Sequence, residues 1–193
     1  MERDAAEIRA IEIFRLRASA EAERYGTDGW VFLRELIQNS RDAGATRVDI
    51  TTDVTDGVER VRVSDDGSGM SLEHARRYLF RLYASSKAGR GSAGRFGIGF
   101  WSVLRFEPAA VRICSNPGSE EAGWGLRLSG DLEVLEAVPC TVGSATEVVL
   151  ERPSGAGELG RRVMEAVHRD ARFIRRRDAT GRLLEVRVDG RLM

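Results

Sequence analysis

Lysine, cysteine and long apolar runs are scarce in this sequence. The shortage of cysteine and the lack of long apolar runs each exclude a class of protein. Lys87 is the single lysine among the 30 basic residues of the 193-residue chain. The two cysteines, Cys114 and Cys140, are too few for a disulfide framework and lack the spacing of a zinc site. No apolar run approaches the roughly 18 residues of a membrane span, and the charged residues 1–4 do not start a signal peptide. These absences predict a cytoplasmic protein with reduced thiols and no membrane partner.

The charges of the chain balance, with 30 basic and 30 acidic side chains. A net charge of zero does not favour nucleic acid or an anionic membrane as a partner. The length and the 42% of hydrophobic residues suit one folded domain, which we place at residues 1–180. Residues 181–193 are interpreted as the start of a following strand, because residues 186–191 resemble a strand that enters a turn without a return strand. We therefore interpret the chain as part of a longer protein.

Hydrophobic periodicity and turn residues predict the order of helices and strands. Helices are predicted at residues 4–24, 28–43 (capped by Thr27 or Asp28), 71–82 (capped by Ser71), 96–105 and 157–172. Strands are predicted at residues 46–53 and 58–64, joined by a hairpin turn at residues 55–57. Further strands are predicted several times within 109–151 and at 183–188. Residues 83–95, rich in Ser, Gly and Ala, are predicted to form a mobile loop. Because helices gather early and strands later, the pattern favours an α+β fold with a mixed sheet over a doubly wound fold.

The second predicted helix carries Glu35, Asn39 and Asp42 at positions i, i+4 and i+7. This spacing places the three side chains on one helical face. The amide oxygen of Asn39 suits one position of an octahedral Mg²⁺ shell that is completed by phosphate oxygens and waters. The carboxylate of Glu35 suits the orientation and deprotonation of an attacking water. The alternative for this helix alone is an ordinary solvated polar face.

A glycine turn at residues 65–70 follows the second predicted strand. Gly67 and Gly69 allow positive φ angles and the close approach of a flat ligand to the backbone. Asp65, which precedes them, offers a carboxylate acceptor for an exocyclic amine such as N6 of adenine. The alternative is a plain connection between a strand and a helix.

A second glycine segment, residues 94–100, opens a short apolar helix. Glycines at a helix N-terminus expose backbone N–H groups, which bind phosphate. Residues 89–94 match the dinucleotide pattern G-x-G-x-x-G, but a helix and a loop precede them instead of a strand, which excludes that reading. The sequence G-x-x-x-x-G-K-[ST] is absent, so a nucleotide site here is not a P-loop.

These three segments occur in the order 35–43, 65–70 and 94–100, and together they resemble the GHKL ATPase superfamily of gyrase, the ninety-kilodalton heat-shock chaperone, histidine kinases and MutL. The resemblance covers roughly residues 8–175. It implies a Bergerat-type two-layer sandwich, in which helices cover one face of a mixed, mostly antiparallel sheet beside a mobile ATP lid.

The resemblance also implies roles for individual residues, with ATP or ADP and Mg²⁺ as the bound groups. Glu35 becomes the general base, Asn39 the Mg²⁺ ligand and Asp65 the residue that binds adenine. Thr146 shares the adenine contact in a fourth motif, in which Ala145 replaces the family's glycine. The remaining ATP contacts are assigned to Asp42, Ala43, Gly67, Gly69, Met70, Lys87, Gly94, Arg95, Phe96, Gly97, Ile98, Gly99 and Phe100.

Two branches of the superfamily share features with this chain. Residues 94–102 resemble the chaperone, whereas residues 42–49 resemble MutL. We expect a chaperone-like domain that binds Mg-ATP, hydrolyses it slowly and drives self-association of the parent protein. The alternatives are a MutL-like ATPase of a DNA-processing protein, a nucleotide sensor that does not hydrolyse, and an interaction domain with degenerate motifs. The histidines, His74 and His168, are expected at the surface.

Overall fold

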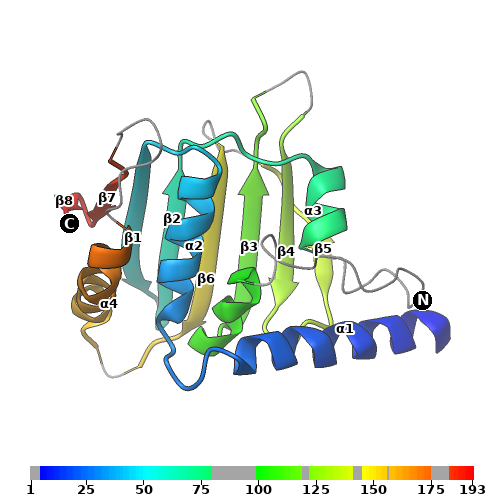
Figure 1. Cartoon of the computed structure of the whole chain (residues 1–193). Helices are drawn as coiled ribbons and strands as arrows, with labels where there is room; N and C mark the ends of the chain where they lie inside the picture. The colour runs from blue at the N-terminus through cyan, green and yellow to red at the C-terminus, as the bar shows by residue number, and fades with distance from the viewer. Residues whose placement is uncertain (1–4, 80–98, 119–121, 141–144, 156, 175–182) are drawn as a thin grey trace.

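The computed structural model describes residues 5–79, 99–118, 122–140, 145–155, 157–174 and 183–193 (Figure 1). Its helices are α1 (Ala5–Glu23), α2 (Val31–Asp42), α3 (Leu72–Tyr78), the 3-10 helix η2 (Gly99–Phe106) and α4 (Leu159–Ile174). Its strands are β1 (Arg47–Thr55), β2 (Val58–Asp65), β3 (Ala110–Ser115), β4 (Trp124–Ser129), β5 (Leu135–Ala137), β6 (Thr146–Pro153), β7 (Glu185–Val188) and β8 (Arg191–Leu192). None of the helices within these ranges is long and apolar enough to cross a membrane.

The described strands form one sheet in the order β5-β4-β3-β6-β2-β1-β7-β8. Every neighbouring pair is antiparallel except β1 and β7, which run parallel. Figure 1 shows α2, η2 and α4 on one face of this sheet, while α1 runs across its lower end. The predicted α+β class and the mixed, mostly antiparallel sheet with helices on one face are therefore confirmed. The predicted mobile loop, residues 83–95, lies outside the described residues, and with it most of the ATP lid that the resemblance implies.

The core lies between the helices and the face of the sheet that they cover. Val61 and Val63 of β2 alternate toward this face and are buried, as the period of two requires. From the opposite side, α2 buries one stripe of its surface, which consists of Val31, Phe32, Leu33, Leu36, Ile37 and Ser40. This packing fixes the rotation of α2 about its own axis. The polar stripe of the helix therefore points partly away from the sheet and partly along the surface of the sheet.

The turn between β1 and β2 agrees with the sequence prediction. Thr55 pairs with Val58, which leaves Asp56 and Gly57 as a two-residue loop. Their φ angles are 52° and 72°, and positive φ at both positions is typical of the type I′ turn that matches strand twist. The hairpin sets the register that places Asp65 at the end of β2.

Two helix starts differ in outcome. Ser71 caps α3 as predicted, because its hydroxyl accepts a hydrogen bond from the backbone N–H of His74 at 3.2 Å. The predicted cap of α2 at Thr27 or Asp28 is wrong: the helix begins at Val31 and Trp30 is its N-cap, without a side-chain bond. Asp28 instead accepts from the N–H of Trp30 at 2.9 Å, which forms a turn before the helix.

The end of the chain adds two strands to the sheet. Val186 and Val188 of β7 are buried beside β1, with Val48 opposite Val186. After a turn at Asp189, Arg191 pairs with Val188 in the antiparallel strand β8. The expected absence of a return strand is therefore wrong, because two residues form one.

Candidate functional site

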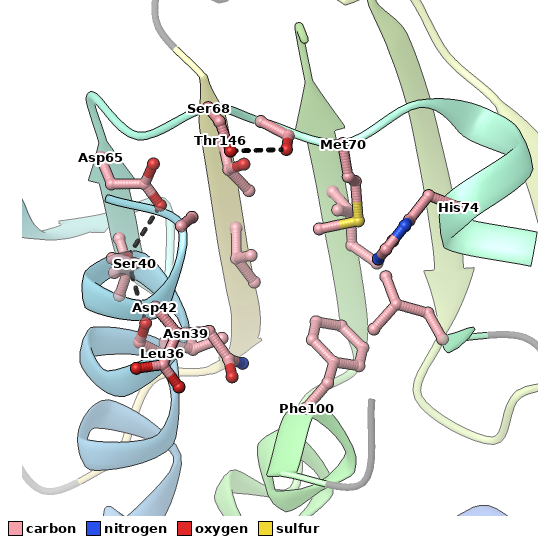
Figure 2. A pocket seen from close by; sticks show the side chains of 16 residues that line it. Leu36, Asn39, Ser40, Asp42, Asp65, Ser68, Met70, His74, Phe100 and Thr146 are labelled. Carbon is pink, nitrogen blue, oxygen red and sulfur yellow. Dashed lines mark hydrogen bonds between the residues drawn. The ribbon is translucent and has the colours of Figure 1, made fainter. Parts of the chain in front are cut away.

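A cavity of about 240 Å³ opens between α2, the glycine turn after β2, α3 and the start of η2, over strands β3 and β6 (Figure 2). Its walls come from segments that are far apart in the sequence and that the sheet brings together. Its lining consists of Leu36, Asn39, Ser40, Asp42, Ala43, Val63, Asp65, Ser68, Gly69, Met70, His74, Leu79, Phe100, Ile113, Thr146 and Val148.

Asp65 is the buried acid of this cavity, with 9% of its surface exposed. Its Oδ2 accepts a hydrogen bond from the hydroxyl of Ser40 at 2.8 Å (Figure 2). Its Oδ1 accepts from the N–H of Gly67 at 2.9 Å. Burial raises the pKa of Asp65, although both hydrogen bonds act in the opposite direction. A carboxylate oxygen has two lone pairs, so an acceptor remains for the amine of a ligand.

The glycine turn is held rigidly against the neighbouring strands. The backbone N–H of Met70 donates to the hydroxyl of Ser115 at 2.9 Å, and the indole N–H of Trp124 donates to the carbonyl of Met70 at 2.7 Å. Gly69 has a φ of 62°, and a Cβ there would collide with the carbonyl oxygen of Asn116. Glycine at this position is therefore required by conformation and by space.

Thr146 lies beside the acid because the sheet register places it there. It is the partner of Asp65 in the pairing of β2 with β6, and of Ser115 in the pairing of β3 with β6. The hydroxyls of Ser115 and Thr146 are 3.1 Å apart, and Ser115 also donates to the carbonyl of Ala145 at 2.8 Å. A row of polar groups thus crosses three strands at the end of the cavity where Asp65 lies.

The polar face of α2 meets the cavity only in part. Asn39 and Asp42 are exposed and line it. Glu35, one turn earlier, lies outside the lining, and 15% of its side chain is exposed. A Cβ on Gly99 would approach Glu35 Oε2 to 2.5 Å, so the carboxylate lies against the first residue of η2.

A metal ion in this site would be coordinated largely by oxygen atoms of the bound small molecule. Within the described ranges, no group of three or more His, Cys, Asp and Glu side chains could hold a metal. The exposed amide of Asn39 offers one hard oxygen toward the cavity. This donor fits Mg²⁺, which commonly keeps several waters and binds through few protein ligands together with phosphate oxygens.

Most of the sequence-predicted residues that can be placed come together. Eight of them line the cavity: Asn39, Asp42, Ala43, Asp65, Gly69, Met70, Phe100 and Thr146. Gly67 is not part of the lining, and a Cβ added to Gly67 would lie 3.1 Å from the Cβ of Ala43. Glu35 and Gly99 contact each other beside the cavity. Lys87 and residues 94–98 (Gly94, Arg95, Phe96, Gly97 and Ile98) lie outside the described residues.

Sequence reasoning missed part of the lining. Ser40 belongs to the buried stripe of α2, and only the packing of that helix on β2 reveals its bond to Asp65. His74, expected as a plain surface residue, is exposed but turns its ring toward the cavity beside Met70 and Phe100 (Figure 2). The sequence signal for His74 is its position three residues after Ser71, the predicted cap, which places it in the first turn of α3 and close in sequence to the glycine turn.

Comparison with known proteins agrees with this geometry. Residues 27–121 match the family model described as histidine kinase-, DNA gyrase B- and HSP90-like ATPase. The matched range contains α2, the glycine turn and η2, which supply most of the cavity. The domain belongs to the GHKL ATPase superfamily.

Several curated relatives of this GHKL domain are named DNA mismatch repair protein MutL. The protein from Phocaeicola vulgatus is 37% identical over 123 residues, which cover 60% of this chain and 19% of the relative. The protein from Halobacterium salinarum is 30% identical over 160 residues, or 81% of this chain and 18% of the relative. The match thus spans about a fifth of each relative. These relatives support the MutL-like alternative better than the chaperone-like reading, which they do not confirm.

Proposed function

We propose that this domain binds Mg-ATP and hydrolyses it slowly, as the MutL-like ATPase module of a DNA-processing protein. The observation that carries the proposal is the buried carboxylate of Asp65, which Ser40 and Gly67 hold at the cavity wall while Asn39 offers its amide at the same cavity. A hydrogen-bond acceptor that is fixed beside apolar walls suits the amine of a purine. The exposed amide of Asn39, on the polar face of α2, suits the metal-bound phosphates.

The described residues suggest a division of roles. Asp65 accepts the adenine amine and Thr146 supplies a neighbouring hydroxyl. Asn39 would hold Mg²⁺, which neutralises phosphate charge when bound. Glu35 takes the proton of a water whose oxygen attacks the γ-phosphorus. The bond from that phosphorus to the bridging oxygen breaks, and ADP and phosphate leave.

The relatives extend the proposal beyond this chain. Because the chain spans about a fifth of the MutL proteins that it matches, mismatch repair itself belongs to those whole proteins. For the parent of this domain we propose a DNA-processing role in which ATP drives the association of two copies. The balanced charge of the chain does not favour this domain as the main contact to nucleic acid.

The decisive experiment compares binding with hydrolysis. ATP affinity and single-turnover hydrolysis are measured for the wild type, Glu35→Gln, Asn39→Ala and the surface control Glu165→Gln. We expect Glu35→Gln to bind ATP within about twofold of the wild type and to lose roughly 10²–10⁴-fold in rate, which is the usual contribution of general acid–base catalysis. Asn39→Ala should weaken binding only when Mg²⁺ is present. Equal hydrolysis by Glu35→Gln and the wild type would remove the enzymatic role.

One observation favours a second candidate, a nucleotide sensor that does not hydrolyse. Both oxygens of Glu35 already have donors, since Arg34 binds Oε1 at 2.9 Å and Tyr25 lies 3.3 Å from Oε2. If these contacts persist when ATP binds, Glu35 is a structural residue. Tight ATP binding without hydrolysis above that of Glu35→Gln is the result that selects the sensor.

A further inference from the structure

The surroundings of Glu35 contain a contact that the proposed roles leave unexplained. Tyr25 lies just after α1 and directs its hydroxyl at Glu35 Oε2 across 3.3 Å. Arg34 donates to the other oxygen, Oε1, from Nε at 3.1 Å and from Nη2 at 2.9 Å. The two carboxylate oxygens of Glu35 are therefore distinguished by their partners.

The oxygen that faces Tyr25 is also the one that faces the glycine segment. A Cβ added to Gly99 would be 2.5 Å from Glu35 Oε2 and 3.5 Å from the hydroxyl of Tyr25. The backbone at the start of η2, Glu35 and Tyr25 thus meet at one point. If the glycine segment receives the phosphates, Oε2 is the oxygen on the phosphate side, and the hydroxyl of Tyr25 leaves it one lone pair for a water.

The position of Tyr25 is fixed by the end of α1. Its backbone N–H donates to the carbonyl of Ala22 at 3.1 Å, and Ala22 is buried. Gly26 follows with a φ of 69° and ends the helix. A side chain anchored in this way reaches α2 with little freedom of its own, which is what a positioning group requires.

The hydroxyl of Tyr25 is protonated at neutral pH. Burial, together with the negative charge and the hydrogen bond of Glu35, raises the pKa of Tyr25 to about 12. A protonated phenol beside a carboxylate donates to it, and at 3.3 Å this bond is longer than the roughly 2.5–3.0 Å that is typical of O–H···O pairs.

We propose that Tyr25 is a positioning residue for ATP hydrolysis: it fixes Glu35 Oε2 at the start of η2, so that this oxygen receives the proton of the attacking water. The inference rests on the proposed function, since it assigns no role to Tyr25 if Glu35 is not the base. Tyr25 itself is not among the residues that line the cavity. It acts through Glu35, and its loss should affect the rate and leave nucleotide affinity unchanged.

The test uses Tyr25→Phe in the 193-residue chain, which removes the hydroxyl and keeps the ring. We expect ATP affinity within about twofold of the wild type and a single-turnover rate roughly 10- to 100-fold lower, because a misplacement of a reacting group by about 1 Å can cost about 100-fold. Tyr25→Leu removes the ring as well and should show the same rate, with a lower melting temperature. Glu21→Gln changes a carboxylate near Tyr25 that bonds to Arg24 and not to Glu35, and it should behave as the wild type.

Glu35→Gln is assayed in parallel, so that two failures are distinguishable. If Glu35→Gln is inactive and Tyr25→Phe hydrolyses at the wild-type rate or faster, the inference about Tyr25 is wrong and the proposed function stands. If hydrolysis does not depend on Glu35, the proposed function fails and the role of Tyr25 fails with it. A Tyr25→Phe variant that loses rate and affinity together would show a structural contact and would also overturn the proposal.

Discussion

The hydroxyl of Ser40 lies 2.8 Å from Oδ2 of Asp65 and joins the buried side of α2 to the end of β2. The same hydroxyl is 3.0 Å from the carbonyl oxygen of Leu36, one helical turn earlier. One hydroxyl hydrogen serves one of these acceptors at a time, and a charged carboxylate is the stronger. The bond therefore fixes the acid that we assign to the nucleotide base, and it does so from a residue of the core.

Ser40→Ala should weaken ATP binding about tenfold, because a hydrogen bond to a charged group contributes roughly 1.5–3 kcal/mol and part of that is recovered by water. Isothermal titration with Mg-ATP measures the change. Ser64→Ala is the matched control: Ser64 precedes Asp65 on β2 but bonds to Asp49 on the face of the sheet away from the helices. If the two variants bind ATP equally, Ser40 does not position Asp65 for the nucleotide.

Asp65→Asn should stabilise the ligand-free domain at neutral pH and abolish ATP binding. Burial raises the pKa of Asp65 above its ordinary 3.8, so folding favours the protonated form. The associated stability is complete below pH 3.8 and is lost as the pH rises through the raised value. Asparagine keeps the shape without the charge, and its amide can donate to Ser40, whose hydroxyl then donates to Leu36. Urea unfolding at a series of pH values measures the change in the free energy of unfolding.

The neighbouring acid provides a control of opposite sign. Burial acts to raise the pKa of Asp66, but hydrogen bonds from Thr46 and Arg47 outweigh it and lower the pKa. The stability that Asp66 contributes is present above pH 3.8 and is lost as the pH falls through the lowered value. Asp66→Asn should therefore destabilise the domain at neutral pH. Equal shifts of both variants in one direction would refute this assignment of the two acids.

The sequence predicted the site well where a motif lies on one element, and less well where two elements meet. Asn39 and Asp42 share one helical face, so their presence in one cavity follows from the helical period. Thr146 reaches Asp65 only through the register of β6 on β2, and it was placed by family resemblance. Ser40 could not be predicted as a site residue, because a single serine within the apolar stripe of α2 belongs to no recognisable polar pattern.

The fold shows the same division between local and tertiary information. The hairpin turn at Asp56 and Gly57 follows from local turn chemistry and was predicted. The start of α2 was predicted too early. Its N-cap is Trp30, which makes no side-chain capping bond and packs against Phe106 instead, with the two ring centres 5.4 Å apart. The strand β8 has only two residues, Arg191 and Leu192, which is too short for any periodic pattern.

Arg152→Leu should destabilise the domain by about 3–5 kcal/mol, because it leaves the buried Glu59 without its ion partner. Glu59 is 2% exposed and accepts from Arg152 Nε at 2.8 Å, while the guanidinium stacks 3.9 Å from the ring centre of Phe106. Replacing Glu59 by leucine as well should recover most of the loss. The surface pair of Arg161 with Glu165 is the control, and Arg161→Leu should leave the free energy of unfolding close to that of the wild type, because exposed ion pairs contribute little. Thermal and urea unfolding measure the loss of stability in Arg152→Leu and in Arg161→Leu. Similar losses in the two variants would contradict the role of Arg152 as the partner of the buried Glu59.

Gly69→Ala should destabilise the glycine turn far more than a comparable substitution elsewhere. Gly69 and Gly118 have nearly equal φ angles, 62° and 64°, so alanine pays the same left-handed conformational cost of about 1–2 kcal/mol at either site. They differ in space, because a Cβ at Gly69 meets the carbonyl groups of Asn116 and Ala145, whereas at Gly118 it meets nothing within 4 Å. The difference in the free energy of unfolding between the two variants therefore isolates the clash, which we expect to add about 1–3 kcal/mol. Gly69→Ala should also lower ATP affinity, since relief of the clash moves Met70 away from Ser115, and Gly118→Ala should bind ATP as the wild type does. Equal unfolding energies would mean that the turn moves freely and that its rigid attachment to β3 does not hold the cavity open.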